Sequence, residues 1–252
     1  MKKVLLATSR ASAMVISSAA SADNIGLFLG VSAWDSTPSG AIQDGPDSID
    51  LDQRLGLESD TVNQFYITLE HPIPLIPNVR IQHSGLEVDG GVNSGASFEF
   101  DGVIHSANAN TVTNFDLTHT DATAYWQMID TVVGVDVGIT ARSFDGEVNI
   151  TSNIGSVGQA ASSQAFDVVL PMLYGRVAVK LPLTGLTADV TGNFISFEDD
   201  SVSDITARLN YEFRSGLGVD LGYRTFTIDA EDDDLTVDVE FDGVFAGVSF
   251  HF

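Results

Sequence analysis

Five histidines and 35 acidic residues are the side chains with which this chain could do acid–base or metal chemistry. His119 and Asp121 lie two positions apart, so on a strand they would share a face and the carboxylate could orient the imidazole as a general base. His83 and Ser84 are adjacent, so on a strand they would point to opposite faces and could not form a nucleophile–base pair. No second Asp pair and no partnering serine is evident beside His119 and Asp121, so the sequence predicts no catalytic residue, no cofactor and no enzymatic activity.

Two acidic runs, at 44–60 and 229–242, could offer carboxylate oxygens to Ca²⁺ or Mg²⁺. Neither run has the D-x-[DN]-x-[DN]-G-x₅-E spacing of a dedicated calcium loop. We predict solvated acidic loops and no metal site. Divalent cations, alone or as bridges to lipopolysaccharide phosphates, stay open as partners of these loops.

Composition excludes several other classes of function. The formal net charge is −24, which opposes binding to nucleic-acid phosphates. The absence of cysteine excludes disulfides, cysteine metal sites and an acylated lipoprotein cysteine. No stretch approaches the ~18 apolar residues that a transmembrane helix needs.

The first 22 residues have the layout of a secretory signal peptide. Lys2, Lys3 and Arg10 form a basic region, an apolar segment runs over 11–19, and 20–22 read Ala-Ser-Ala, a small-x-small cleavage site. We expect cleavage after residue 22 and a single domain over 23–252. Eight basic and 35 acidic residues then remain, a net charge of −27.

Apolar residues recur at every second position in segments separated by turn residues. In one of them, Phe65, Ile67 and Leu69 alternate with polar neighbours. Alternating segments of about ten residues are the signature of transmembrane β-strands. We place ten strands at 25–33, 64–70, from 79 onward, up to 128, 133–141, up to 181, 186–194, 205–213, 217–223 and up to 252. This predicts an all-β fold, a single transmembrane antiparallel up-and-down barrel of ten strands, with eight and twelve as alternatives.

Loop lengths give the barrel two different ends. The connections at 71–78, 129–132, 182–185 and 215–216 are short, whereas 36–60, 87–110 and 151–164 read as long loops. Tight turns are expected near Asp200 and at 231–234, and 97–103 alternates weakly, as a hairpin would. Short turns on the periplasmic side and long loops outside are typical of outer-membrane barrels.

The last strand carries a signature of its own. Apolar residues occupy every second position up to the final residue: Val244, Ala246, Val248, Phe250 and Phe252. This pattern resembles the C-terminal signal by which the bacterial barrel assembly machinery recognises its substrates. It implies that machinery as a partner, the cell outer membrane as the location, and lipid and lipopolysaccharide as surroundings.

The charged residues decide between a membrane barrel and a soluble β-sandwich or lipocalin-like barrel, which share the alternation. Six basic residues lie in expected strands opposite the apolar face: Arg80, Arg142, Arg176, Lys180, Arg208 and Arg224. Six acidic residues lie on that same face: Glu70, Asp136, Asp189, Asp204, Glu212 and Asp220. Because Arg or Lys facing lipid costs ~2–4 kcal/mol at the midplane, we expect all twelve to face the lumen.

Residues 70–80 read Glu-His-Pro-Ile-Pro-Leu-Ile-Pro-Asn-Val-Arg. This stretch resembles a turn in a family of small proteobacterial outer-membrane β-barrel proteins that tend to occur in genomes with the GlyGly-CTERM sorting system. The resemblance implies a fold and a location but no functional residues.

Known barrel enzymes use Asp and His near the outer rim, as omptin-type proteases do, or Ser and His, as lipid A deacylases do; no complete set of either kind is evident. The sequence favours a structural barrel with a packed, charge-paired lumen or a small passive, porin-like pore. The first alternative is surface binding or adhesion through the acidic loops, and the second is a barrel hydrolase.

Overall fold

The computed structural model describes residues 25–252, apart from 46, 74, 94, 156–157 and 233–234. The expected signal peptide therefore lies outside the described residues. No helix of the described chain is long and apolar enough to cross a membrane.

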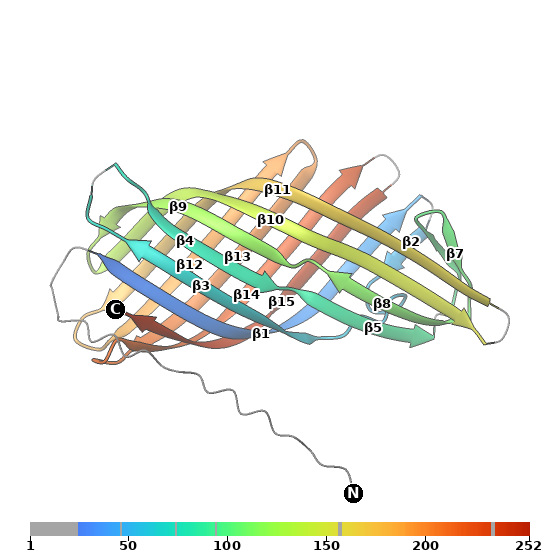
Figure 1. Cartoon of the computed structure of the whole chain (residues 1–252), viewed down its shortest axis with the longest axis horizontal. Helices are drawn as coiled ribbons and strands as arrows, with labels where there is room; N and C mark the ends of the chain where they lie inside the picture. Colours follow the sequence, from blue (N-terminus) through green and yellow to red (C-terminus); the bar gives the residue numbers. More distant parts are fainter. Residues whose placement is uncertain (1–24, 46, 74, 94, 156–157, 233–234) are drawn as a thin grey trace, which may run out of the picture.

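Fifteen strands make up the described fold, and ten of them close into an antiparallel barrel (Figure 1). The order around the barrel is β1-β3-β4-β9-β10-β11-β12-β13-β14-β15, and β15 pairs with β1 to complete the ring. The bounds of these strands are β1 Gly26–Asp44, β3 Asp60–Glu70, β4 Asn78–Gly85, β9 His119–Asp130, β10 Val133–Ile154, β11 Gly158–Leu181, β12 Leu186–Phe197, β13 Asp200–Glu212, β14 Leu217–Asp232 and β15 Leu235–His251. The prediction of a ten-stranded barrel is confirmed.

The barrel has a short-turn end and a long-hairpin end. At the short-turn end, four connections of two to seven residues join β3 to β4, β9 to β10, β11 to β12, and β13 to β14, and the C-terminus lies there (Figure 1). The expected short turns are thus confirmed. Pro72 and Pro77 fit this position because a turn outside the ladder needs no backbone N–H.

The expected long loops are instead mostly strand, and this part of the prediction is wrong. β1 continues to Asp44, and β10 and β11 extend together to Ile154 and Gly158. β5 (Glu87–Asn93) continues β4 and pairs with β8 (Asn110–Asp116), which leads into β9. The physical reason is that these segments remain paired beyond the apolar band, where polar side chains replace apolar ones on the outer face.

Smaller strands complete the long-hairpin end. β2 (Asp47–Asp50) folds back on β1, and β6 (Phe98–Phe100) pairs with β7 (Val103–His105). The hairpin expected at 97–103 is therefore present as β6–β7. It is anchored by the buried His105, whose ring nitrogens lie 2.8 Å from Ser152 Oγ and 3.1 Å from Ser162 Oγ.

Side chains alternate between an outward and an inward face, as the period of two requires. The outward face carries an exposed apolar band around the ring, including Leu29, Ile67, Ile139, Leu173 and Val219. Above this band the pattern reverses: on β10 the outward residues become polar, and the inward residues become apolar. The barrel therefore has an outward apolar girdle and, towards the long hairpins, an inward apolar core.

Candidate functional site: the closed lumen

A layer of four buried charged residues crosses the middle of the barrel. They are Asp121 on β9, Arg142 on β10, Asp204 on β13 and Arg224 on β14, and each is at most 4% exposed. We call these four residues the closed layer. Each lies on the inward face of its strand, because successive side chains alternate between the two faces and its neighbours along the strand are more exposed.

Asp204 is the centre of the closed layer. Its carboxylate accepts hydrogen bonds from Arg142 Nη2 at 2.5 Å and from Arg224 Nη2 at 2.7 Å and Nε at 2.9 Å. Asp121 holds the other side of Arg142 through two bonds of 2.7 Å. Such charge-assisted, bidentate pairs are stronger and better oriented than neutral hydrogen bonds.

These bonds span the lumen. β10 and β13 are separated by two strands, so the Arg142–Asp204 bond bridges the interior. Arg224 Nη2 lies 3.2 Å from His119 Nε2 on β9, five strands away around the ring, the largest separation that ten strands allow. Arg224 Nη1 also donates to Ser84 of β4 at 3.2 Å. The closed layer therefore ties opposite walls together.

A second ion-pair group lies nearer the short-turn end. Arg208 Nη2 lies 3.0 Å from Asp189 and its Nη1 3.6 Å from Asp220. Arg176 lies 3.4 Å from Asp189 and 3.3 Å from Asp136. Asp136, Asp189 and Asp220 are each about 4–5% exposed, so these pairs are also largely removed from solvent.

The other predicted lumen charges lie closer to the short-turn rim. Glu70 accepts a 2.6 Å hydrogen bond from the Tyr125 hydroxyl, and Arg80 lies 4.0 Å over the Tyr66 ring. Lys180 pairs with Asp130 at 2.5 Å, but both side chains are about half exposed. Glu212 lies 3.6 Å from His251 Nδ1, also at the rim.

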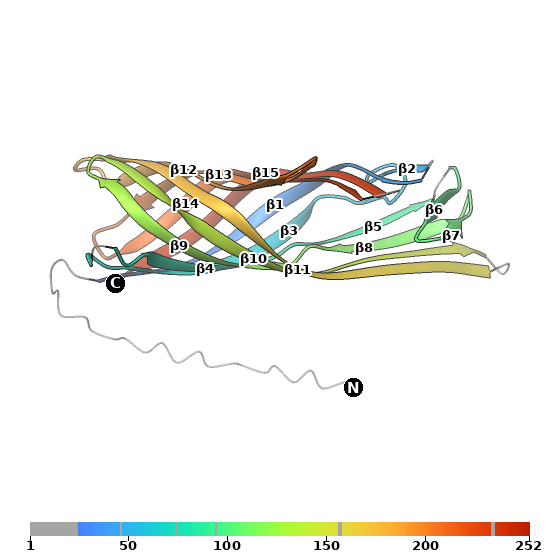
Figure 2. The same cartoon turned by 90° about the horizontal axis from the view of Figure 1, so that it is seen from above.

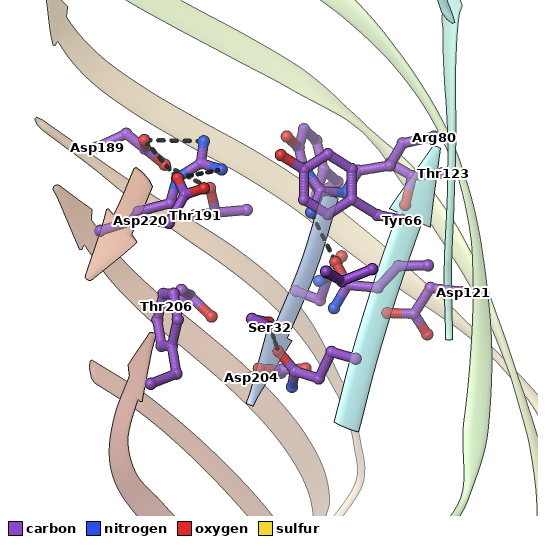
Figure 3. Close-up of a pocket in the computed structure, with 17 residues that line it drawn as sticks. Ser32, Tyr66, Arg80, Asp121, Thr123, Asp189, Thr191, Asp204, Thr206 and Asp220 are labelled. Atoms are coloured by element: carbon purple, nitrogen blue, oxygen red, sulfur yellow. Dashed lines mark hydrogen bonds and ion pairs between the residues drawn. The ribbon is translucent and has the colours of Figure 1, made fainter. Parts of the chain in front are cut away.

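Two hollows remain on this side of the closed layer. A cavity of about 340 Å³ opens towards the short-turn end and is lined by Glu70, Arg80, Lys180 and Glu212 among others. Beyond it lies a cavity of only about 70 Å³, in which Asp189, Asp204 and Asp220 face Tyr66 and Arg80 (Figure 3). The hollow thus narrows sharply as it approaches the closed layer.

An apolar layer follows on the other side. Trp34, Phe226 and Phe241 have no exposed surface, and the Phe226 and Phe241 rings stack 6.3 Å apart. The Arg224 guanidinium lies 4.7 Å over the Trp34 ring, and that of Arg142 lies 5.2 Å over Phe226. The sequence predicted a polar, charge-paired lumen, whereas the inward side chains towards the long hairpins are apolar. Above the apolar girdle the outward face meets water, so the apolar side chains turn inward.

His119 and Asp121 do not form the acid–base pair that their spacing allowed. The Nδ1 of His119 lies 2.8 Å from the Leu117 carbonyl oxygen, so it carries the proton, and Nε2 accepts from Arg224. The Asp121 carboxylate is engaged by Arg142. His119, Asp121 and Asp204 could together offer three ligand atoms to a cation, but two guanidinium groups already neutralise the carboxylates. The residues present do not fit a metal.

The acidic runs are only partly loops. Asp44 and Asp47 accept the backbone N–H groups of Asp101 and Glu99 at 2.9 Å, which ties the β6–β7 hairpin down. Asp238, Glu240 and Asp242 belong to β15. Asp233 and Asp234 lie outside the described residues.

Sequence reasoning did not place Asp121, His119 or Trp34 in the lumen. The signal for the first two was present, since His119, Asp121 and Thr123 alternate with outward residues up to Trp126 and Met128. Trp34 offered a weaker signal, because β1 loses its apolar alternation after Ala33.

Comparisons with known proteins support the architecture. No protein-family model and no curated protein sequence matches this chain. The solved structure of the outer membrane protease OmpT from Escherichia coli matches with a TM-score of 0.51 and 8% identity, over 91% of this chain and 97% of that chain. The chain has the fold of an outer-membrane β-barrel protein.

Two further outer-membrane β-barrel structures are similar at lower scores. The attachment invasion locus protein Ail of Yersinia pestis has a TM-score of 0.33 and 10% identity, over 91% of this chain and 99% of that chain. The translocator domain of the autotransporter NalP from Neisseria meningitidis has a TM-score of 0.37 and 9% identity, over 92% and 90%.

Proposed function

We propose that this protein is a structural barrel of the cell outer membrane whose lumen is closed to ions and small solutes, rather than a passive pore or an enzyme. The observation that carries the proposal is the closed layer, in which Arg142 and Arg224 bond across the interior to Asp204 and His119. The buried Trp34 ring and the stacked Phe226 and Phe241 rings lie on the long-hairpin side of this layer, with Arg224 over Trp34 and Arg142 over Phe226.

The outward apolar girdle supports the membrane location. Large apolar side chains such as Leu173, Leu221 and Val244 are more than half exposed. In water, burying that surface would be worth ~25 cal/mol per Å², so a soluble barrel would not expose a continuous ring of it. Membership of the small proteobacterial barrel family that the 70–80 turn resembles is part of this proposal.

The closed layer also makes an open state costly. Opening the lumen would require the buried Arg142–Asp204 and Arg224–His119 contacts to break, although Arg142 would keep Asp121 and Asp204 would keep Arg224 as ion-pair partners.

Single-channel recording tests the proposal. We expect the refolded protein to give no discrete conductance steps in planar bilayers in concentrated potassium chloride. The heat-modifiable gel mobility of protein recovered from the same vesicles shows that it has folded. Arg80→Ser is the matched variant, because it widens the 340 Å³ cavity but leaves the closed layer intact. We expect this variant to give no discrete conductance steps either. Discrete steps in the unchanged protein would overturn the proposal of a closed barrel.

Sidedness is a separate prediction. If the long-hairpin end is extracellular, an epitope tag inserted at Gly45 or Gly155 should bind antibody on intact cells, because both residues lie in turns at that end. A tag inserted after Ile73, in the 71–77 turn, should bind only after the outer membrane is permeabilised. The reverse labelling pattern would place the long hairpins in the periplasm.

A further inference from the structure

The barrel wall has a lateral aperture towards the long-hairpin end. The β12–β13 hairpin ends at 198–199, whereas β11 runs on to Gly158. The last paired residues of β11 and β12 on this side are Leu173 and Phe194. Within the described chain, residues 158–172 of β11 therefore pair with β10 on one edge and with no barrel strand on the other. Figure 2 shows the extended β10–β11 hairpin standing apart from the strands across the barrel.

An apolar cavity of about 480 Å³ lies behind this aperture, and we call it the lateral cavity. Its walls come mainly from β10, β11, β12, β13, β14 and β15, with further side chains from β1, β6 and β8. They carry mainly aliphatic and aromatic side chains, among them Phe166, Leu170, Ile195, Val202, Ile228 and Val237. Cavities of ~300–1,000 Å³ with such walls are typical small-molecule sites. The polar lining is confined to Gln164, Asp200, Ser201 and Asp229.

The lateral cavity differs from an ordinary packed core. Protein interiors fill space as densely as organic crystals, with few voids larger than a water molecule. Here Phe197 and Val168 line the cavity yet are 70% and 40% exposed. An apolar occupant would cover this surface.

The aperture is continuous with the outward apolar girdle. Leu173 and Val169 on β11 are 68% and 60% exposed, and Phe194 on β12 is 49% exposed. In the membrane placement proposed above, these residues face the hydrocarbon of the outer leaflet. An apolar molecule could then pass from the bilayer into the cavity without crossing water.

The acidic residues beside the cavity determine which head group a bound molecule can carry. Asp200 and Asp229 lie at the cavity, and Asp238 pairs with Asp229 across β14 and β15. Among the described residues, no Lys or Arg lines the cavity. A carboxylate or phosphate head would therefore meet like charge without a counter-ion, which disfavours anionic lipids and fatty-acid anions.

We propose that the lateral cavity, between β11 and the β12–β13 hairpin, binds an uncharged molecule with a long alkyl chain that enters sideways from the outer leaflet. This inference rests on the membrane location in the proposed function but not on the closed lumen.

Photolabelling tests this inference. The protein, refolded in phosphatidylcholine vesicles, is irradiated with a twelve-carbon alcohol that carries a diazirine in its chain, and the adducts are mapped by mass spectrometry. We expect adducts on the inward residues Phe166, Leu170 and Val202, in addition to those on Leu173 and Phe194 from the surrounding bilayer. The analogue with a carboxylate in place of the alcohol should label the inward residues much less at pH 7.

Ala230→Phe places a ring in the cavity, since Ala230 lines it. Because added bulk in a filled site costs binding energy, inward labelling should fall about tenfold. The matched control is Ala165→Phe on the outward face of β11, which should label like the unchanged protein.

Adducts confined to outward residues, or undiminished inward labelling in Ala230→Phe, would overturn the proposal. Equal inward labelling by the carboxylate analogue would overturn the uncharged head group. Labelling of Leu173 and Phe194 reports the membrane placement separately in every variant.

Discussion

Asp204→Asn should lower the free energy of unfolding by about 3–5 kcal/mol. Asp204 is 4% exposed and holds both Arg142 and Arg224, so asparagine keeps the shape but leaves two buried guanidinium groups with Asp121 as their only close carboxylate in the closed layer. Urea-induced unfolding in lipid vesicles, followed by tryptophan fluorescence and by heat-modifiable gel mobility, measures the loss.

The control is Asp130→Asn, which breaks the half-exposed pair with Lys180. Exposed pairs contribute about 0–1 kcal/mol, so this change should leave the free energy of unfolding nearly unchanged. Replacing all four members of the closed layer by apolar residues of similar size (D121L, R142M, D204L, R224M) should recover most of the loss, because no buried charge then remains uncompensated. A loss in Asp204→Asn no larger than that in Asp130→Asn would show that the closed layer does not stabilise the barrel.

Phe252→Ala should reduce the folded protein in the outer membrane of cells severalfold. Phe252 directly follows β15, the strand that closes the ring. Its backbone N–H donates to the Leu27 carbonyl at 3.0 Å, and its ring contacts Phe250 edge-on at 4.6 Å. If the terminal aromatic is read by the assembly machinery, the defect appears during assembly and not in the finished barrel. The amount of heat-modifiable protein in isolated outer membranes measures it.

Phe213→Ala is a closely matched control for this experiment. Phe213 lies at the same end of the barrel and makes a similar edge-on contact with Tyr211, at 4.8 Å. It should assemble normally, and both variants should refold equally well from urea in vitro. A refolding defect in Phe252→Ala as large as its defect in cells would make Phe252 a packing residue and not an assembly signal.

The two faces of the strands and the short turns were predictable from the sequence by itself. The period of two is local, so alternation such as Phe65, Ile67 and Leu69 fixes which side chains share a face without any knowledge of neighbouring strands. The short turns at 182–185 and 215–216 likewise follow from where the alternation stops. Ten such segments were enough to predict the barrel.

The strand lengths were harder to predict, for a physical reason. Beyond the apolar girdle the outward face meets water, so on β10 the apolar residues move from the outward positions, such as Ile139, to inward ones such as Phe144 and Val148. Where the apolar residues move from one face of a strand to the other, the local alternation is broken, and the sequence pattern then indicates the end of a strand. The segments at 36–44 and 151–164 were therefore expected to be loops, although their backbones continue the ladder.

Only the tertiary structure decided which charges meet and where the lumen opens. Alternation places Arg142 and Asp204 on the inward face, but their 2.5 Å contact depends on the closure and stagger of the ring, which sets their relative heights. The lateral aperture likewise depends on the β12–β13 hairpin being shorter than its neighbour β11. Contacts across a barrel join residues far apart in the chain, so they are fixed by the closure of the whole ring and not by any local pattern.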